Sequence, residues 1–242
     1  MGRSLVVGDI HGGYYALKEV IEDVRPAEDD YLIFLGDYVD GWSDSADVVA
    51  YLIALKKEHT CIFLRGNHDD LATQWMIFGK SNEQWLNSGG LSTIESYHRY
   101  GQEDKEPHVD FFQSLINYHI DEKNRLFVHG GFSNLNGPSY EFYPNVVYWD
   151  RSLWEMALSL DHNLDEESPF YPERLKLFHE IYIGHTPTTR YGHYQPMNVK
   201  NLWNIDTGAA FKGSISIMDI DTKEIWQSTP VQDLYPDENG RN

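Results

Sequence analysis

Cysteine and basic residues are both scarce in this chain, and each shortage excludes a class of protein. Cys61 is the one cysteine among 242 residues, so no disulfide framework can form within the chain, and a reducing compartment is expected. Lysine and arginine number 19 against 38 aspartate and glutamate residues, which leaves a formal charge of −19. Phosphates repel so acidic a protein, so we expect no general binding to nucleic acid or to anionic membranes. The same acidity suits the binding of cations.

Long apolar runs are absent as well. Residues 1–9 hold too short an apolar stretch for a signal peptide, and no stretch reaches the roughly 20 apolar residues of a membrane span. Apolar residues make up 41% of the chain and charged residues 24%, as is ordinary for a globular protein. We predict a soluble, cytoplasmic protein with one domain over residues 1–235 and a loose tail over 236–242. The sequence does not fix an oligomeric state.

Short apolar runs that end beside glycine and a metal-capable side chain recur along the chain. Their length and composition are typical of strands buried on both faces. Between the first three runs, segments 14–24 and 46–57 carry apolar residues at helical spacing. This order predicts parallel strands whose following polar residues meet at one edge of a sheet. The runs are 5–7, 32–35, 62–64, 126–128 and 181–183.

The rest of the chain is less regular. Residues 202–206 and 214–220 alternate like strands, and 224–228 would complete a hairpin with the second of them. Residues 132–180 are rich in proline, asparagine, serine and tyrosine, so we predict loops and short helices that cover the cleft.

Six potential metal ligands follow the five runs. Hard divalent cations prefer carboxylate oxygen, and borderline ones also accept imidazole nitrogen. Any one of these residues alone would more often be a turn or core residue. Together they predict a dinuclear site in which Asp9 and His11 chelate one ion and Asp37 bridges both. The six are Asp9, His11, Asp37, Asn67, His129 and His185; the other histidines lack this context and are expected to be structural.

The ordered motifs resemble those of the calcineurin-like metallophosphoesterases. Within that family the chain is most similar to the phosphoprotein phosphatase group in its compact bacterial and phage form. The resemblance implies an α/β (α+β) fold, a four-layer αββα sandwich of two mixed β-sheets flanked by helices. The motifs are Gly-Asp-Ile-His-Gly (8–12), Gly-Asp-Tyr-Val-Asp (36–40), Gly-Asn-His-Asp (66–69), His-Gly-Gly (129–131) and Gly-His-Thr (184–186), with weaker likeness at 85–90, 93–97, 148–151 and 206–208.

The resemblance also implies two divalent metal ions, manganese first, with iron or zinc as alternatives. The first ion would be held by Asp9, His11 and Asp37. The second would be held by Asp37 again together with Asn67, His129 and His185.

Catalytic roles follow from the same likeness. His68 would be the general acid, Asp40 would orient it, and Arg151 and Asn67 would bind the substrate phosphate. Two ions would acidify a shared water, and the resulting bridging hydroxide would attack phosphorus in line with the leaving oxygen. A serine or threonine alkoxide leaves poorly unless it is protonated, which a histidine held by a carboxylate can do.

Three positions depart from the phosphoprotein phosphatase pattern. Gly41 stands where that group usually has a phosphate-binding arginine, and Asp69 stands where it usually has glutamate. Arg190 or Lys212 could supply the missing cation from another loop. Trp42, where glycine is common, is either a packed loop residue or a stacking face for a nucleobase.

Three functions are therefore considered. The first is hydrolysis of phosphomonoesters, on phosphoserine or phosphothreonine of a protein or peptide and on small aryl phosphates. The second is cleavage of a dinucleoside polyphosphate, as in diadenosine tetraphosphatases, or of a related nucleotide. The third is a binding scaffold without turnover, which is disfavoured because all six ligand positions are filled.

Overall fold

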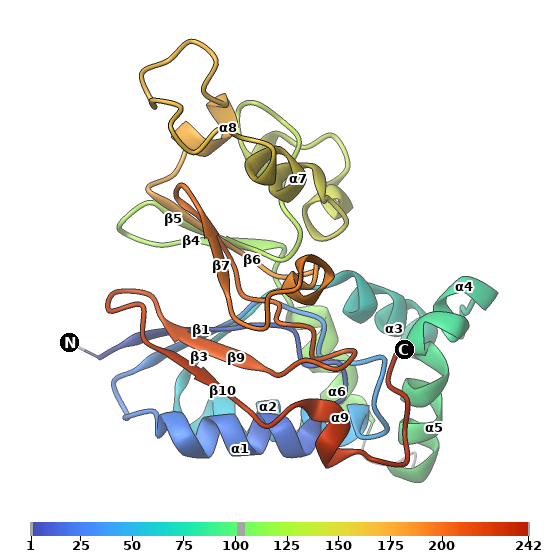
Figure 1. Ribbon diagram of the computed structural model, residues 1–242. Helices are drawn as coiled ribbons and strands as arrows, with labels where there is room; N and C mark the ends of the chain where they lie inside the picture. The colour runs from blue at the N-terminus through green and yellow to red at the C-terminus, as the bar shows by residue number, and fades with distance from the viewer. Residues whose placement is uncertain (1, 101–104, 242) are drawn as a thin grey trace.

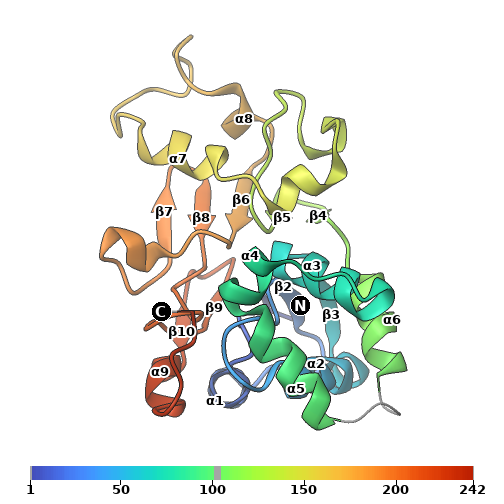
Figure 2. The same cartoon turned by 90° about the vertical axis from the view of Figure 1, so that its right-hand side faces the viewer.

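Two five-stranded sheets lie face to face in the computed structural model, with helices over their outer faces (Figures 1 and 2). The structure describes residues 2–100 and 105–241. This arrangement confirms the predicted four-layer sandwich of mixed sheets. The strands are β1 (Ser4–Val7), β2 (Tyr31–Phe34), β3 (Thr60–Phe63), β4 (Tyr118–Ile120), β5 (Arg125–Val128), β6 (Glu180–Ile183), β7 (Met197–Val199), β8 (Leu202–Asn204), β9 (Ser216–Asp219) and β10 (Ile225–Gln227).

The first sheet has the strand order β10-β9-β1-β2-β3. β1, β2 and β3 are parallel, with Val6 opposite Ile33, as strand-helix-strand order requires. β9 runs antiparallel to β1 and forms the predicted hairpin with β10. Helices α1 (Tyr14–Val24) and α2 (Ser45–Glu58) connect the parallel strands and cover the outer face of the sheet (Figure 1), because their apolar stripes are buried there.

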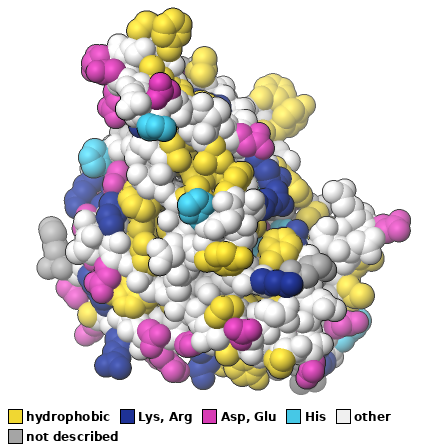
Figure 3. Space-filling model, viewed as in Figure 1, with side chains coloured by type: hydrophobic (Ala, Val, Ile, Leu, Met, Phe, Trp, Pro, Cys, Tyr) yellow, Lys and Arg dark blue, Asp and Glu magenta, His cyan; other side chains and the backbone are white. Residues whose placement is uncertain are grey.

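The second sheet has the strand order β4-β5-β6-β8-β7, with three parallel strands inside two antiparallel edges. Its outer face is covered by α7 (Ser152–Leu158), α8 (Glu173–Lys176) and the loops of segment 132–180, where Leu153, Trp154 and Leu175 are buried. The predicted position over the cleft differs from this arrangement, because the apolar side chains of the segment pack on the outer face of the sheet and most of the segment lies there. Figure 3 shows hydrophobic side chains at the upper end of the molecule. Within segment 132–180, Phe142 and Phe170 are 86% and 83% exposed.

The helices fill the connections and the flank of the first sheet. Within residues 2–100 and 105–241, none of them has the length and apolar character needed to cross a bilayer. They are α1 (Tyr14–Val24), α2 (Ser45–Glu58), α3 (Asn67–Phe78), α4 (Glu83–Trp85), α5 (Leu91–Tyr100), α6 (Glu106–Ser114), α7 (Ser152–Leu158), α8 (Glu173–Lys176) and α9 (Val231–Leu234), with a π-helical turn at Leu86–Gly90 and 3₁₀ turns at Pro138–Tyr140, Pro144–Tyr148 and Thr188–Tyr191.

The layer between the sheets is a small apolar cluster to which both sheets contribute. Val6 and Ile33 from the first sheet belong to the same cluster as Phe127 and Tyr182 from the second. The rings of Phe127 and Tyr182 are stacked with centroids 5.0 Å apart. This packing fixes the two sheets relative to each other, so that loops from both can build one site.

The segment that we expected to be a loose tail is packed against the body of the protein. Glu238 accepts hydrogen bonds from the backbone N–H and the hydroxyl of Ser43, at 2.9 and 2.6 Å. The backbone N–H of Arg241 donates to the Ala210 carbonyl at 2.8 Å. The prediction was therefore wrong for residues 236–241, because composition does not reveal these partners; residue 242 lies outside the described residues.

Candidate metal centre

The six predicted ligands come together from both sheets. Asp9, His11 and Asp37 form one group whose ligand atoms all lie within 4.8 Å of one another, and Asp37, His129 and His185 form a second. Asp37 belongs to both groups, as a bridging carboxylate must. All six side chains are deeply buried, with exposures between 0% and 6%.

Backbone turns directly after the strands aim these side chains inward. His11, Asp37, Asp40 and His185 all have left-handed backbone conformations, with φ of 54°, 55°, 70° and 68°. Side chains other than glycine adopt this region at a cost, and such residues cluster at functional sites. The convergence of these side chains therefore comes with locally strained backbone conformations, which the rest of the fold stabilises.

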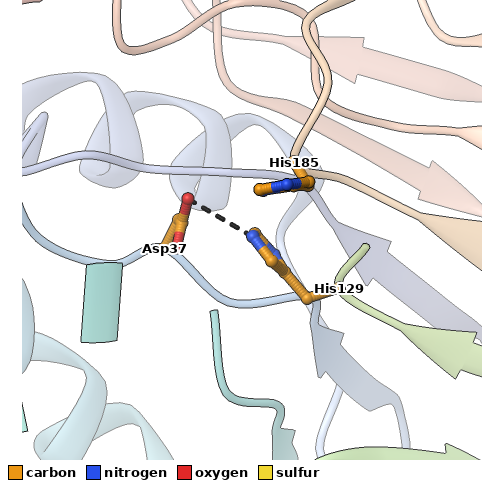
Figure 4. Close-up of side chains that lie close together, drawn as sticks. All are labelled: Asp37, His129 and His185. Carbon is orange, nitrogen blue, oxygen red and sulfur yellow. Dashed lines mark ion pairs between the residues drawn. The ribbon is translucent and has the colours of Figure 1, made fainter. Parts of the chain in front are cut away.

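Interatomic distances place Asp37 at the centre of the group. Its Oδ2 lies 3.3 Å from His129 Nε2, the ion pair drawn in Figure 4, and 3.5 Å from His11 Nε2. Asn67 Oδ1 lies 3.2 Å from His129 Nε2. The buried Nε2 of His185 has no hydrogen-bond partner among the described residues. Oxygen and nitrogen donors that converge in this way, one of them without a partner, fit a pair of divalent cations.

The other ring nitrogens of two histidines are held by backbone carbonyls. His11 Nδ1 lies 2.7 Å from the Asp40 carbonyl oxygen, and His129 Nδ1 lies 2.9 Å from that of Leu35. Such contacts fix the tautomer and leave Nε2 as the ligating nitrogen.

Buried carboxylates stand unusually close together in this centre. Burial raises the pKa of Asp9 well above its usual range, and the neighbouring Asp206 raises it further. Burial would also raise the pKa of Asp37, but His129, His68 and His11 hold it well below its usual range. Burial would lower the pKa of His129, but the charge of Asp37 raises it to about 9. Bound cations would relieve the repulsion between these carboxylates.

His68 and Asp40 form the expected pair beside the ligands. His68 Nδ1 lies 2.7 Å from Asp40 Oδ2, and Asp40 is completely buried. The carboxylate also accepts hydrogen bonds from Trp85 Nε1 and the Thr93 hydroxyl, each at 2.6 Å. Sequence reasoning gave Trp85 and Thr93 no role, although both lie in stretches that resemble the phosphatases.

The departure at Asp69 has a clear structural consequence. Its carboxylate accepts hydrogen bonds from the backbone N–H groups of Asp37 and Tyr38, at 2.8 and 2.9 Å, and of Gly66 at 2.8 Å. Asp69 therefore holds the loop that carries Asp37 against the start of α3.

Arginines line the pocket that opens onto the ligands. Arg151 and Arg190 both line it, whereas Lys212 is exposed and is not among its lining residues. Burial lowers the pKa of Arg151, and the nearby guanidinium groups of Arg190 and Arg241 lower it further. Of the two cations that we considered for the missing arginine, Arg190 is the one at the site.

Two more residues of the pocket had no assigned role. Asp206 lines the inner pocket, and it ends the alternating segment 202–206, as Asp9 and Asp37 come after their strands, so its place at the end of a predicted strand could have identified it. Trp149, which is 40% exposed, lines the adjoining groove beside Asn67; it lies in the stretch 148–151 that resembles the phosphatases, but it was given no role of its own.

Trp42 is a packed residue and offers no face to a ligand. It is completely buried, its Nε1 donates to the Ala209 carbonyl at 2.7 Å, and its ring stacks on Tyr235 with centroids 5.4 Å apart. The interpretation as a packed loop residue is therefore confirmed.

Comparison with known proteins agrees with this geometry. The family model of calcineurin-like phosphoesterases matches residues 2–208. The chain belongs to the calcineurin-like phosphoesterase family. This family consists of metal-dependent phosphoester hydrolases that use two metal ions, and the predicted resemblance and enzyme class are confirmed.

Two curated relatives from Saccharomyces cerevisiae are serine/threonine protein phosphatases. The PP2A-like phosphatase PPG1 is 32% identical over 130 residues, which are 53% of this chain and 32% of the relative. The catalytic subunit A1 of phosphatase 2B is 34% identical over 129 residues, 53% of this chain and 21% of the relative. The chain thus matches only a third or less of the length of these relatives.

Solved structures share the fold at low sequence identity. A candidate diadenosine tetraphosphatase is 18% identical with a TM-score of 0.62, over 93% of this chain and 92% of the other. A Saccharomyces cerevisiae protein serine/threonine phosphatase similar to human PP5 is 15% identical with a TM-score of 0.57, over 94% and 80%. These similarities establish the fold. They do not identify the substrate, which has to be inferred from the chemistry of the site.

Proposed function

We propose that this protein hydrolyses phosphomonoesters, with phosphoserine and phosphothreonine in proteins or peptides as its substrate class. The observation that carries the proposal is the buried ligand set centred on Asp37 with the His68–Asp40 pair beside it. The curated relatives, both serine/threonine protein phosphatases, support the choice of substrate.

The proposed cofactors are two divalent cations, with manganese first and iron or zinc as alternatives. Such ions supply an acidified water and electrostatic stabilisation of the phosphoryl oxygens. Asp9, His11 and Asp37 would hold one ion. Asp37, Asn67, His129 and His185 would hold the other.

The side chains supply the remaining requirements of the reaction. His68, held by Asp40 through Nδ1, can give a proton from Nε2 to the leaving oxygen, which a serine or threonine alkoxide needs. Arg151 lines the pocket next to His68, and its buried Nε has no partner among the described residues. A guanidinium in this position suits charge-assisted hydrogen bonds to a phosphate.

A substrate comparison tests the proposal. Purified protein is first loaded with manganese and its metal content measured, and phosphate release is then followed from a phosphoserine peptide, p-nitrophenyl phosphate and diadenosine tetraphosphate. We expect manganese-dependent hydrolysis with the highest kcat/KM on the monoesters. A preference for diadenosine tetraphosphate would favour the dinucleoside polyphosphatase function instead. No turnover of any substrate with both ions bound would support a non-catalytic scaffold.

A further inference from the structure

The packed C-terminal segment delivers a third arginine to the pocket. Arg241 lines the inner pocket together with Arg151 and Arg190, next to His11 and His68. Its guanidinium carbon lies 5.6 Å from the centre of the Phe211 ring, an arrangement that favours a cation over an aromatic face. Arg241 lies 33 positions beyond residue 208, where the matched family region ends, and it is nevertheless part of the site wall.

Two glycines make room for this side chain. A Cβ atom on Gly41 would lie 3.6 Å from Arg241 Cγ, and one on Gly89 would lie 3.3 Å from the same atom. Gly41 has a φ of 139°, a conformation that side chains rarely adopt, so an arginine at position 41 would be strained here. The aliphatic part of Arg241 thus lies over the position where the sequence lacks an arginine.

The anchor of the segment is the unusual Trp42. A Cβ on Gly240 would come within 2.7 Å of the Trp42 ring, so only glycine permits this close approach. The Arg241 backbone N–H is bound by the Ala210 carbonyl, and Glu238 is bound by Ser43, next to Trp42 in the chain. The two departures from the phosphatase pattern at positions 41 and 42 therefore belong together. Trp42 packs against the C-terminal segment, and Gly41 leaves space for the Arg241 side chain.

Charge indicates what the three arginines would bind. Among the described residues, no carboxylate forms an ion pair with Arg151, Arg190 or Arg241, and the buried Nε atoms of Arg151 and Arg241 have no hydrogen-bond partner. Of the six arginines elsewhere in the described residues, four pair with carboxylates, namely Arg3, Arg65, Arg99 and Arg125. Three guanidinium groups without carboxylate partners around one pocket favour the binding of an anion that carries more than one negative charge.

We infer that Arg241 binds the phosphate of the substrate from the C-terminal segment and selects dianionic monoesters over monoanionic diesters. The inference rests on the proposed phosphoesterase function for its substrate. A dianion offers more charge and one more free oxygen than a diester, so each added guanidinium favours the monoester.

The test compares R241A and R241K with K212A, which removes one exposed cation outside the pocket. With metal content and melting temperature measured for each variant, we expect R241A to retain both ions and to bind inorganic phosphate at least about tenfold more weakly by calorimetry. Its kcat/KM should fall by a similar factor for p-nitrophenyl phosphate and by clearly less for bis(p-nitrophenyl) phosphate. R241K should recover part of the loss, and K212A should behave as wild type.

A second variant tests the position of the arginine without removing it. G240V places a branched side chain against Trp42 and should displace Arg241, so it should weaken phosphate binding as R241A does. The inference is overturned if metal-loaded R241A binds phosphate within twofold of wild type, or if it loses monoester and diester hydrolysis equally. If wild type hydrolyses no ester at all, the proposed function fails, and the phosphate titration still decides the role of Arg241.

Discussion

The two sheets contribute different chemistry to the same centre. The first sheet carries Asp9, His11 and Asp37 on short turns after β1 and β2, and its outer face is covered by regular helices. The second sheet carries His129 and His185 after β5 and β6, and its outer face is covered largely by loops and short helices. The two ligand carboxylates thus come from one sheet, and two of the ligand imidazoles come from the other.

This difference means that neither sheet alone can build the site. Asp37 lies 3.3 Å from His129 only because the apolar layer between the sheets holds them together. The metal centre therefore depends on the packing of the two sheets against each other. Substitutions in each sheet should separate the contribution of one sheet from that of the other.

The largest effect is expected for the shared ligand. D37A removes the carboxylate common to both groups of ligands, so both ions should be lost and activity should fall by more than about 1000-fold. H11A and H129A, which remove one ligand from each sheet, should each lose mainly one ion. Metal analysis by mass spectrometry distinguishes these patterns, and two ions retained in D37A would contradict the bridging role.

The next effect separates proton donation from metal binding. H68N should keep both ions and lower kcat by about 10²- to 10⁴-fold on a phosphoserine peptide, whose leaving group needs a proton. The loss should be smaller on p-nitrophenyl phosphate, whose leaving group is already a good one. Equal losses on both substrates, measured at saturating concentration, would remove His68 from the role of general acid.

A core substitution tests the link between the sheets. F127A deletes a buried ring from the layer between the two sheets, and such a change costs about 3–5 kcal/mol of unfolding free energy. Denaturant unfolding measures this loss. F112A, which deletes a buried ring from the cluster outside the first sheet, is the matched control. We expect F127A to weaken metal binding at a temperature where F112A, still folded, does not.

The smallest effect is expected for Asp30, which directly precedes β2, at the opposite end of that strand from Asp37. Burial would raise the pKa of Asp30, but hydrogen bonds from Arg3 and Ala27 hold it below its usual value, with Arg3 Nη2 at 2.7 Å. The charged form therefore stabilises the fold above the unfolded pKa of about 3.9, and this contribution is lost as pH falls through the folded pKa. D30N should lower stability at pH 7 by less than about 1 kcal/mol, because Arg3 is partly exposed. An unchanged pH profile of unfolding below pH 5 would contradict this.

Much of the first sheet and its ligands could be predicted from the sequence. Its strands are continuous apolar runs, and α1 spans the predicted residues 14–24. The ligands can be predicted from these strands. The carboxyl ends of parallel strands meet at one edge of the sheet, so the carboxylates that follow them come together there. Asp206 obeys the same rule after 202–205, and the pattern could have indicated it.

The C-terminal segment could not be predicted in this way. Its composition is that of an exposed loop, and its position depends on contacts with Trp42, Ser43 and Ala210, far away in the sequence. The hydrogen bonds of Trp85 and Thr93 to Asp40 are equally nonlocal. Periodicity identifies the elements that carry ligands, whereas the surrounding support depends on tertiary contacts.

Anomalous diffraction from manganese-soaked crystals tests the central claim most directly. The account predicts two manganese peaks, one beside Asp9 and His11 and the other beside His129 and His185, with Asp37 in contact with both. A single peak, or peaks bound by other side chains, would contradict it.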